Sequence, residues 1–310
     1  MARNVKISLA MHQPISGDEP GRLRAALKSM GDCVDHSAAL GSELVAFPEI
    51  CAQFGSSDRW KFEGLDGPTL TAMAAKARRH GIYVVCPLPT MDGELRRNSS
   101  VLIGRDGVIV GVYHKNFPTH GELNVGIVPG TETPVFETDF GRVGLSICFD
   151  LNYWEIGSGL CANRAELVIW SSMWTGRRMM GKWAMEFGFH MGGVHAQAAA
   201  FIDMAGREVA HGERTVSDRT GATSLITATL DLDRRLLHHD YNIARLQPLY
   251  AKYGPAAASA EWIAEECMLI FGSRMDGIPN KTHATYVSHA SYNSQHSKAP
   301  PGGGASLRKP

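Results

Sequence analysis

The clearest chemical signal in this chain is a cysteine at the end of an apolar run. Residues 143–147 (Val-Gly-Leu-Ser-Ile) form a β-type segment, Cys148 follows it, and a helix is expected at once, with Asp150 or Asn152 as its cap. A thiol in that place lies near the first free N–H groups of the helix, which favour a thiolate and a developing oxyanion. A lone cysteine in an apolar run is more often a buried packing residue, so Cys148 alone is weak evidence.

Two other apolar runs also end in a reactive side chain. Glu49 follows the run 44–47, and Lys115 follows the run 110–113. Taken singly, a glutamate or lysine after a strand is usually a solvated loop charge. If the three strands share one sheet, however, Glu49, Lys115 and Cys148 meet at one edge of it. That edge would then hold a base, a cation and a nucleophile in one pocket.

In their order and surroundings these motifs resemble the nitrilase, or carbon–nitrogen hydrolase, superfamily. The similarity extends from about Val5 to about Tyr253. It implies an α/β fold of the family's type, a four-layer α-β-β-α sandwich, and a homodimer or higher homo-oligomer formed by packing sandwiches together. The matching pieces are Phe47-Pro48-Glu49, then His114-Lys115 with Pro118, Glu122 and Pro129-Gly130, and finally Gly144 to Asp150.

The resemblance also implies roles for these residues. Glu49 takes the proton of the Cys148 thiol, which attacks an amide-type carbonyl and forms a thioester. The Phe149 N–H and the Lys115 ammonium hold the oxyanion, and Glu49 protonates the leaving ammonia or amine and then activates water. Glu122 falls near the second glutamate of many amidase members, where it orients the lysine or the substrate.

The substrate is only partly indicated. Family members that act on nitriles typically have Trp-Glu after the cysteine, whereas here Phe149-Asp150 follows, so an amide or an N-carbamoyl compound is favoured over a nitrile. The residues after Asp150 and the short stretch between Trp174 and Phe201 depart from most relatives.

Several residues near this region are candidates for substrate contacts. Trp174 and Trp154 are candidates for the mouth of the pocket, although aromatic residues near a helix start more often serve packing. Arg177 and Arg178, just after Trp174, are candidates for binding a substrate carboxylate, although an arginine pair on a loop is more often surface charge.

Composition excludes several other classes of function. Lys plus Arg and Asp plus Glu both number 31, so no net field recruits nucleic acid or an anionic membrane. The six cysteines form no CxxC pair, and the start of the chain has no secretory pattern, so a cytoplasmic protein is expected. No nucleotide-binding motif and no metal-ligand spacing is present, His238-His239 included, so neither a cofactor nor a metal is predicted.

The chain alternates strands and helices over residues 1–255, which we assign to one carbon–nitrogen hydrolase domain. Strands are expected at 5–11, 44–47, 82–86, 98–103, 108–113, 166–171, 194–203, 208–211 and 223–232, and helices at 22–40, 69–80 and around 181–190. Residues 256–287 are predicted as a C-terminal arm with a helix over Ser259 to Phe271. Residues 288–310 have the composition of a disordered tail.

The sequence therefore predicts a cysteine-dependent amidohydrolase without a cofactor, whose partner is a small amide. Three alternatives stay open. They are nitrile hydrolysis on the same three residues, acyl transfer to an amine or hydroxylamine, and a non-catalytic binding protein that kept the fold.

Overall fold

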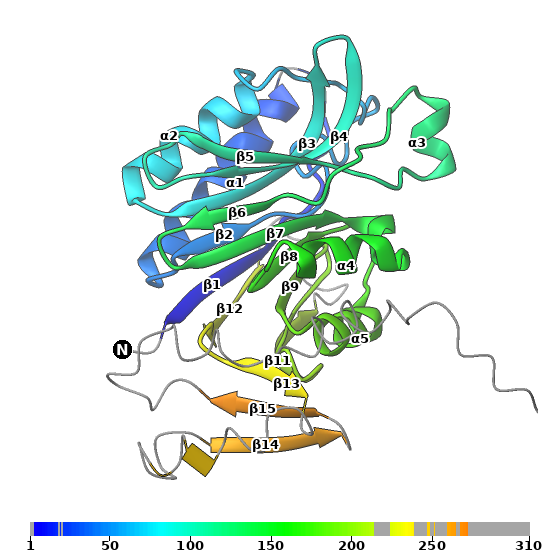
Figure 1. Ribbon diagram of the computed structural model, residues 1–310. Coiled ribbons are helices and arrows are strands. Elements are labelled where there is room, and N and C mark those ends of the chain that lie inside the picture. Colours follow the sequence, from blue (N-terminus) through cyan, green and yellow to red (C-terminus); the bar gives the residue numbers. More distant parts are fainter. Residues whose placement is uncertain are drawn as a thin grey trace, which may run out of the picture.

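The computed structural model describes residues 3–17, 19, 21–213, 224–238, 247–248, 251, 259–264 and 267–271. Two six-stranded sheets, each with helices on its outer face, form its main body (Figure 1). The predicted four-layer α-β-β-α sandwich is therefore confirmed. The predicted domain limits stay a prediction, and the tail at 288–310 lies outside the described residues.

The first sheet has the strand order β12-β1-β2-β3-β4-β5. Strands β1, β2 and β3 run parallel to one another. The β12–β1, β3–β4 and β4–β5 pairings are antiparallel. Two successive reversals bring β5 back to the direction of β3. The strands are β1 Asn4–Met11, β2 Leu44–Ala46, β3 Tyr83–Asp92, β4 Leu95–Ile103, β5 Ile109–His114 and β12 Ser224–Asp231.

The second sheet repeats this plan in the order β11-β10-β9-β8-β7-β6. Strands β7, β8 and β9 run parallel, and the remaining neighbours pair antiparallel. Each sheet is thus built on a β-α-β-α-β-β-β unit with one further strand paired beside its first strand. The strands are β6 Val135–Thr138, β7 Gly141–Ile147, β8 Leu167–Ser171, β9 His190–Val194, β10 Ala198–Ile202 and β11 Glu208–Glu213.

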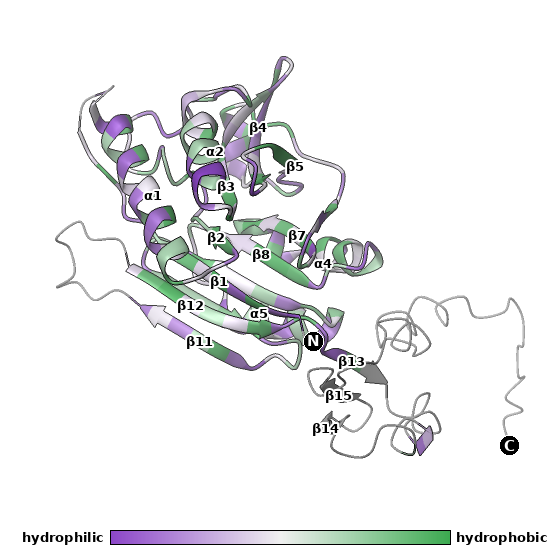
Figure 2. Cartoon of the chain, turned by 90° about the vertical axis from the view of Figure 1, so that its left-hand side faces the viewer, coloured by the Kyte–Doolittle hydropathy of each residue, from purple (hydrophilic) through white to green (hydrophobic). Residues whose placement is uncertain are grey.

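Helices cover the outer face of each sheet. Helices α1 (Gly21–Ala39) and α2 (Pro68–His80) lie side by side on the first sheet, as Figure 2 shows. Helix α2 begins with a proline and ends where Gly81 takes a left-handed conformation with φ of 62°, as a C-terminal glycine should. Helices α4 (Trp154–Ala162) and α5 (Arg177–Phe187) cover the second sheet, and the short α3 (His120–Asn124) lies in the β5–β6 connection.

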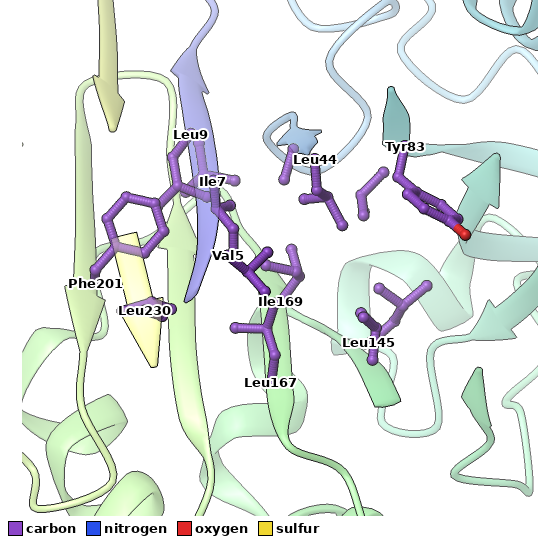
Figure 3. Close-up of a cluster of buried hydrophobic side chains, with 14 of the residues drawn as sticks. Val5, Ile7, Leu9, Leu44, Tyr83, Leu145, Leu167, Ile169, Phe201 and Leu230 are labelled. Atoms are coloured by element: carbon purple, nitrogen blue, oxygen red, sulfur yellow. The ribbon is translucent and has the colours of Figure 1, made fainter. Parts of the chain in front are cut away.

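Buried side chains fill three layers between these elements. The layer between the sheets includes Leu9 from β1, Ile169 from β8 and Phe201 from β10 (Figure 3). The neighbouring residues Val168 and Trp170 instead pack toward α4 and α5. Because successive side chains of a strand point to opposite faces, a strand buried on both faces reads as a continuous apolar run. This is why the central strands could be predicted from the sequence.

Two sequence-based expectations about elements are wrong. The segment expected as one strand at 194–203 contains the last residue of β9, a turn and β10. Strands β9 and β10 pair antiparallel as a hairpin, and His195 N–H donates to the Ala198 carbonyl in the turn, at 2.8 Å. The helix expected over Ser259 to Phe271 is instead two paired strands, β14 Ser259–Ala264 and β15 Cys267–Phe271, which form a three-stranded sheet with β13 Arg235–His238. Short apolar stretches do not distinguish a strand from a helix by periodicity alone.

Candidate active site

The reactive side chains lie where strands of both sheets end. Glu49 comes three residues after β2, Lys115 directly after β5, and Cys148 directly after β7. The expectation that the three strands share one sheet is wrong, because β2 and β5 belong to the first sheet and β7 to the second. The three groups nevertheless meet, because the sheets pack face to face with these strand ends at the same side of the sandwich.

Lys115 is the centre of a buried ionic cluster, with only 1% of its surface exposed. Its ammonium lies 2.9 Å from Glu49 Oε1 and 2.8 Å from Glu122 Oε2. The two carboxylates outweigh the effect of burial, so the pKa of Lys115 is raised. The same contact lowers the pKa of Glu122, although burial acts against it. Lys115 therefore stays charged at neutral pH, and so does Glu122.

Helix α3 holds Glu122 in place. Thr119 is the N-cap residue, and its backbone N–H and its hydroxyl both donate to Glu122 Oε2, at 2.7 and 2.8 Å. In return the Glu122 backbone N–H donates to Thr119 Oγ1 at 3.4 Å, so the two residues form a capping box. The carboxylate that closes the helix start is also the one that binds Lys115, so a local helix signal positions a side chain of the site. The structure brings Glu122 to Lys115, as the resemblance implied.

Sequence analysis missed Asn98, which links the two glutamates. Its side-chain amide donates to Glu49 Oε1 at 2.8 Å and to Glu122 Oε1 at 2.6 Å, and it is fully buried. Asn98 lies in β4, and its backbone carbonyl accepts a hydrogen bond from the backbone N–H of Lys115 at 2.8 Å. The available signal in the sequence was an asparagine within a predicted strand, since a side-chain amide that becomes buried needs hydrogen-bond partners.

Cys148 occupies a strained turn between β7 and a short 3-10 helix, η1 (Cys148–Asn152). Its φ is +44°, which residues with a Cβ rarely adopt. The Trp170 indole N–H donates to the Cys148 carbonyl at 3.0 Å. Helix α4 begins only after this turn, with Tyr153 as its N-cap, so the expected caps Asp150 and Asn152 are wrong.

Asp150 instead ties the cysteine turn to the lysine loop. Its carboxylate accepts from the Tyr113 hydroxyl at 2.7 Å, from Phe117 N–H at 2.9 Å and from Ile147 N–H at 3.0 Å. Burial raises the pKa of Asp150 to about 6, although these hydrogen bonds counteract it. The Asp150 carboxyl group therefore binds its proton more tightly in the folded protein than in the unfolded chain. As a result, the free energy of unfolding decreases as the pH rises from about 4 to 6.

The surroundings of Cys148 favour the thiol, so a base is needed to remove its proton, as the predicted role of Glu49 requires. Burial and, after it, the Glu49 carboxylate raise the pKa of Cys148 to about 11. Lys115, the Ser172 side chain and the Met173 backbone counteract these effects. At pH 7 only about one molecule in ten thousand would carry the thiolate. Such a cysteine needs a base to become a nucleophile.

The end of β8 supplies polar groups beside the cysteine. Strands β7 and β8 pair in parallel with Ile147 opposite Ser171, so Cys148 and Ser172 follow at neighbouring strand ends. The Ser172 hydroxyl is fully buried and accepts from Trp174 N–H at 2.8 Å, which leaves its own proton to donate. The next backbone N–H, that of Met173, donates to Glu49 Oε2 at 3.2 Å.

Replacing Ser172 by alanine is expected to raise the pKa of Cys148 further, because the hydroxyl that favours the thiolate is gone. The measurement is the rate of Cys148 alkylation by iodoacetamide from pH 8 to pH 11. We expect the variant's profile to lie at higher pH than that of the wild type. Ser171→Ala is the matched control, since the neighbouring Ser171 hydroxyl is equally buried and has no hydrogen-bond partner among the described residues. Equal profiles for both variants would contradict this role of Ser172.

A pocket of about 510 Å³ opens in front of Cys148. Phe149 and Trp174 both line it, and Trp174 is 73% exposed, so the predicted place of Trp174 at the mouth is supported by the geometry. Trp154 does not line this pocket and packs on Phe187, with ring centroids 5.8 Å apart. The other lining residues are Leu151, Asn152, Trp170, Thr175, Gly176, Arg177, Arg178 and Met179.

Among the described residues no group of three or more His, Cys, Asp and Glu side chains gathers as a metal ion would require. His238 belongs to β13, and His239 lies outside the described residues.

Among the helices that the structure describes, none has the length and apolar character needed to cross a membrane.

Comparison with known proteins gives a consistent result. A protein of Mycobacterium tuberculosis named as a hydrolase is 27% identical over 254 residues, which cover 73% of this chain and 89% of that protein. The beta-ureidopropionase of Arabidopsis thaliana is 31% identical over 135 residues, which cover 40% of this chain and only 32% of the relative. Among solved structures, an amidase from Nesterenkonia sp. superposes with a TM-score of 0.63 at 20% identity, covering 79% of this chain and 96% of that one.

The family assignment rests on most of the chain. A family model described as carbon–nitrogen hydrolase matches residues 8–233, which extend from β1 past the end of β12 and include every residue of the site described above. This chain belongs to the carbon–nitrogen hydrolase family.

Proposed function

We propose that the protein is a cysteine-dependent amidohydrolase that cleaves the C–N bond of a small amide or N-carbamoyl compound. The observation that carries this proposal is the buried cluster in which Lys115 binds both Glu49 and Glu122 next to Cys148. The Nesterenkonia amidase supports the chemistry, since the acetamide moiety of fluoroacetamide adds covalently to its active-site cysteine in one solved mutant. Another mutant of that amidase is solved with butyramide.

In the acylation half-reaction Glu49 acts as the base. Its carboxylate takes the proton of the Cys148 thiol as the sulfur attacks the substrate carbonyl, because the free thiolate is too rare at neutral pH to do so alone. The oxyanion that forms accepts hydrogen bonds from the Lys115 ammonium and the Phe149 N–H. The protonated Glu49 then gives its proton to the leaving nitrogen, the C–N bond breaks, and a thioester on Cys148 remains.

In the second half-reaction water replaces the nitrogen. Glu49 takes a proton from water as the hydroxyl oxygen attacks the thioester carbonyl, and the same two donors hold the new oxyanion. The C–S bond then breaks, and Glu49 returns the proton to the sulfur. Lys115 stays protonated throughout, since the two carboxylates raise its pKa. Its role is electrostatic, and Glu122 and Asn98 position it and Glu49.

The test follows ammonia and the acyl group together. The protein is incubated with a panel of short amides and N-carbamoyl compounds, with and without hydroxylamine, which intercepts a thioester. We expect ammonia from one substrate group, an acyl hydroxamate when hydroxylamine is present, and an acyl adduct that peptide mapping places on Cys148 after acid quenching.

Cys161 is an internal control in the same molecule. Burial alone raises its pKa to about 11, and no charged group contributes. It therefore has the burial and the pKa of Cys148 without the neighbouring base. An adduct on Cys161 as abundant as that on Cys148 would contradict the proposal, and so would the absence of ammonia and hydroxamate with every substrate. The latter result would favour the non-catalytic binding protein.

A further inference from the structure

Strand β9 ends beside the reactive strand ends, and a histidine follows it. Strands β8 and β9 pair in parallel with Ser171 opposite Val194, and the Ser172 N–H donates to the Val194 carbonyl at 2.9 Å. His195 therefore begins the β9–β10 turn next to the segment that leads from Ser172 to Met173. The proposed reaction steps use no group from this turn.

The backbone N–H of Met173 lies beside both side chains that exchange a proton in the proposed reaction. It donates to Glu49 Oε2 at 3.2 Å. Burial and Glu49 raise the pKa of Cys148, and hydrogen bonding from the Met173 backbone is among the effects that counteract this rise. The same N–H thus favours the Glu49 carboxylate before the proton transfer and the Cys148 thiolate after it. Its position therefore affects the step on which acylation depends.

The two nitrogen atoms of the His195 ring have different partners. Nδ1 accepts a hydrogen bond from the Gln197 N–H at 3.2 Å. Burial lowers the pKa of His195 below its ordinary value of 6.5. A hydrogen bond with the Met173 backbone and the negative charge of Glu49 act against burial without outweighing it, so the ring is neutral at neutral pH. A neutral imidazole has one acceptor and one donor, so Nε2 carries the proton and donates it to the Met173 carbonyl.

The turn that carries His195 is fixed to its surroundings. The Ala196 carbonyl, in the same turn, accepts a hydrogen bond from the side-chain amide of Gln13, just after β1. The His195 ring shares a cavity of only about 10 Å³ with Trp170 and Trp174, so it packs closely against the loop after β8. Reacting groups are held precisely only when the neighbours that support them are themselves fixed.

We propose that His195 is a positioning residue, which holds the Met173 backbone so that the Met173 N–H stays directed at Glu49 and Cys148. This role rests on the proposed function and adds a residue to it. His195 does not line the pocket in front of Cys148, so it acts through Met173 rather than on the substrate. The stretch between residues 174 and 201, which departs from most relatives, thus contributes a support to the site.

Two conservative variants separate the two hydrogen bonds of the ring. In His195→Gln the side-chain amide reaches the place of Nε2 and can still donate to the Met173 carbonyl. In His195→Asn the shorter side chain reaches only the place of Nδ1, where it can accept from the Gln197 N–H. For an amide substrate we expect kcat to fall by about 10- to 100-fold in His195→Asn, with KM nearly unchanged, because small misplacements of reacting groups cost that much. His195→Gln is expected to keep most of the wild-type kcat.

A second measurement needs no substrate. It is the pH profile of Cys148 alkylation by iodoacetamide from pH 8 to pH 11. In His195→Asn this profile should move to higher pH, because a displaced Met173 N–H favours the thiolate less. In His195→Gln the profile should match that of the wild type.

His190→Asn is the matched control. His190 begins β9 at the opposite end of the strand, and its ring also donates to a backbone carbonyl, that of Asp231 at 3.0 Å. Its replacement is expected to lower the midpoint of urea denaturation and to leave the alkylation profile of Cys148 unchanged. A shifted profile in this variant would show that the profile reports damage to β9 in general, and would overturn the role of His195.

The remaining outcomes separate this role from the proposed function. Equal results for His195→Gln and His195→Asn, whether both match the wild type or both are impaired, would overturn the role of the Nε2 donor. A rise in KM at unchanged kcat would show that His195 acts on substrate binding, and would overturn it as well. If the alkylation profiles are as expected but the wild type hydrolyses no amide, the positioning role stands and the amidohydrolase proposal fails.

Discussion

Glu49→Gln is expected to abolish most amide turnover and, at the same time, to make Cys148 more reactive toward iodoacetamide. The two effects have one physical origin. The Glu49 carboxylate is the base that the thiol needs, and its negative charge also raises the pKa of Cys148. Glutamine keeps the size of the side chain and removes both the base and the charge. Loss of a general base typically lowers the rate by about 10²- to 10⁴-fold.

The alkylation profile distinguishes this account from simple damage to the site. With the charge gone, the pKa of Cys148 falls below the wild-type value of about 11, so alkylation at pH 8 should be faster than in the wild type. Ammonia release and alkylation are measured on the same preparation. A variant in which both rates fall together would show that Glu49 only maintains structure.

Glu166→Gln is a suitable control for the Glu49 variant. Glu166 is also a largely buried, ion-paired glutamate, held by Arg3 and Arg235, but it precedes β8 at the end opposite to Ser171. Its replacement is expected to lower the midpoint of urea denaturation while leaving the pH profile of Cys148 alkylation unchanged. A shift of that profile would mean that the effect of Glu49 is not local.

How far the sequence predicts the site depends on whether a residue's role is local. Glu49, Lys115 and Cys148 could be predicted because each closes an apolar strand, and strand ends of a sandwich meet at an edge. Glu122 could be placed by its likeness to the family. Their division between two sheets could not be predicted, because strand order depends on pairings between segments that are distant in the chain.

Asn98 and Ser172 show what remained hidden. Asn98 lies within a strand and matches a glycosylation triplet, and only the register of β4 against β5 brings its amide to the two glutamates. Ser172 becomes the neighbour of Cys148 only through the pairing of β7 with β8. The high pKa of Cys148 likewise results from burial and from Glu49, which is 99 residues earlier in the chain, so the residues next to Cys148 could not indicate it.

Lys115→Met should have the largest effect on stability, with turnover lost as well. Removal of the ammonium leaves the Glu49 and Glu122 carboxylates buried side by side. The Asn98 side-chain amide is then the group that donates a hydrogen bond to both of them. Breaking a buried ion pair by removing one partner typically costs about 3–5 kcal/mol. Lys76→Met is the control, because Lys76 of α2 pairs with Asp35 of α1 at 2.6 Å on the partly exposed surface, where loss of a pair costs about 1 kcal/mol or less.

The stability of the wild type and that of Lys115→Met should change with pH in opposite directions. In the wild type the pKa of Glu122 is below its ordinary value of 4.5, so the cluster stabilises the fold above that pH and the contribution is lost as the pH falls. Without Lys115 the two carboxylates repel each other and one keeps its proton, so the variant should lose stability as the pH rises from 5 to 8. Urea denaturation at both pH values measures this.

The double variant Lys115→Met with Glu122→Gln separates the two functions of the lysine. Removing the second carboxylate relieves the repulsion, so most of the lost stability and the wild-type trend with pH should return. Turnover should not return, because the positive charge that holds the oxyanion is still absent. If turnover recovered together with stability, Lys115 would serve only to balance the glutamates, and the oxyanion would have to be held by other donors such as the Phe149 N–H.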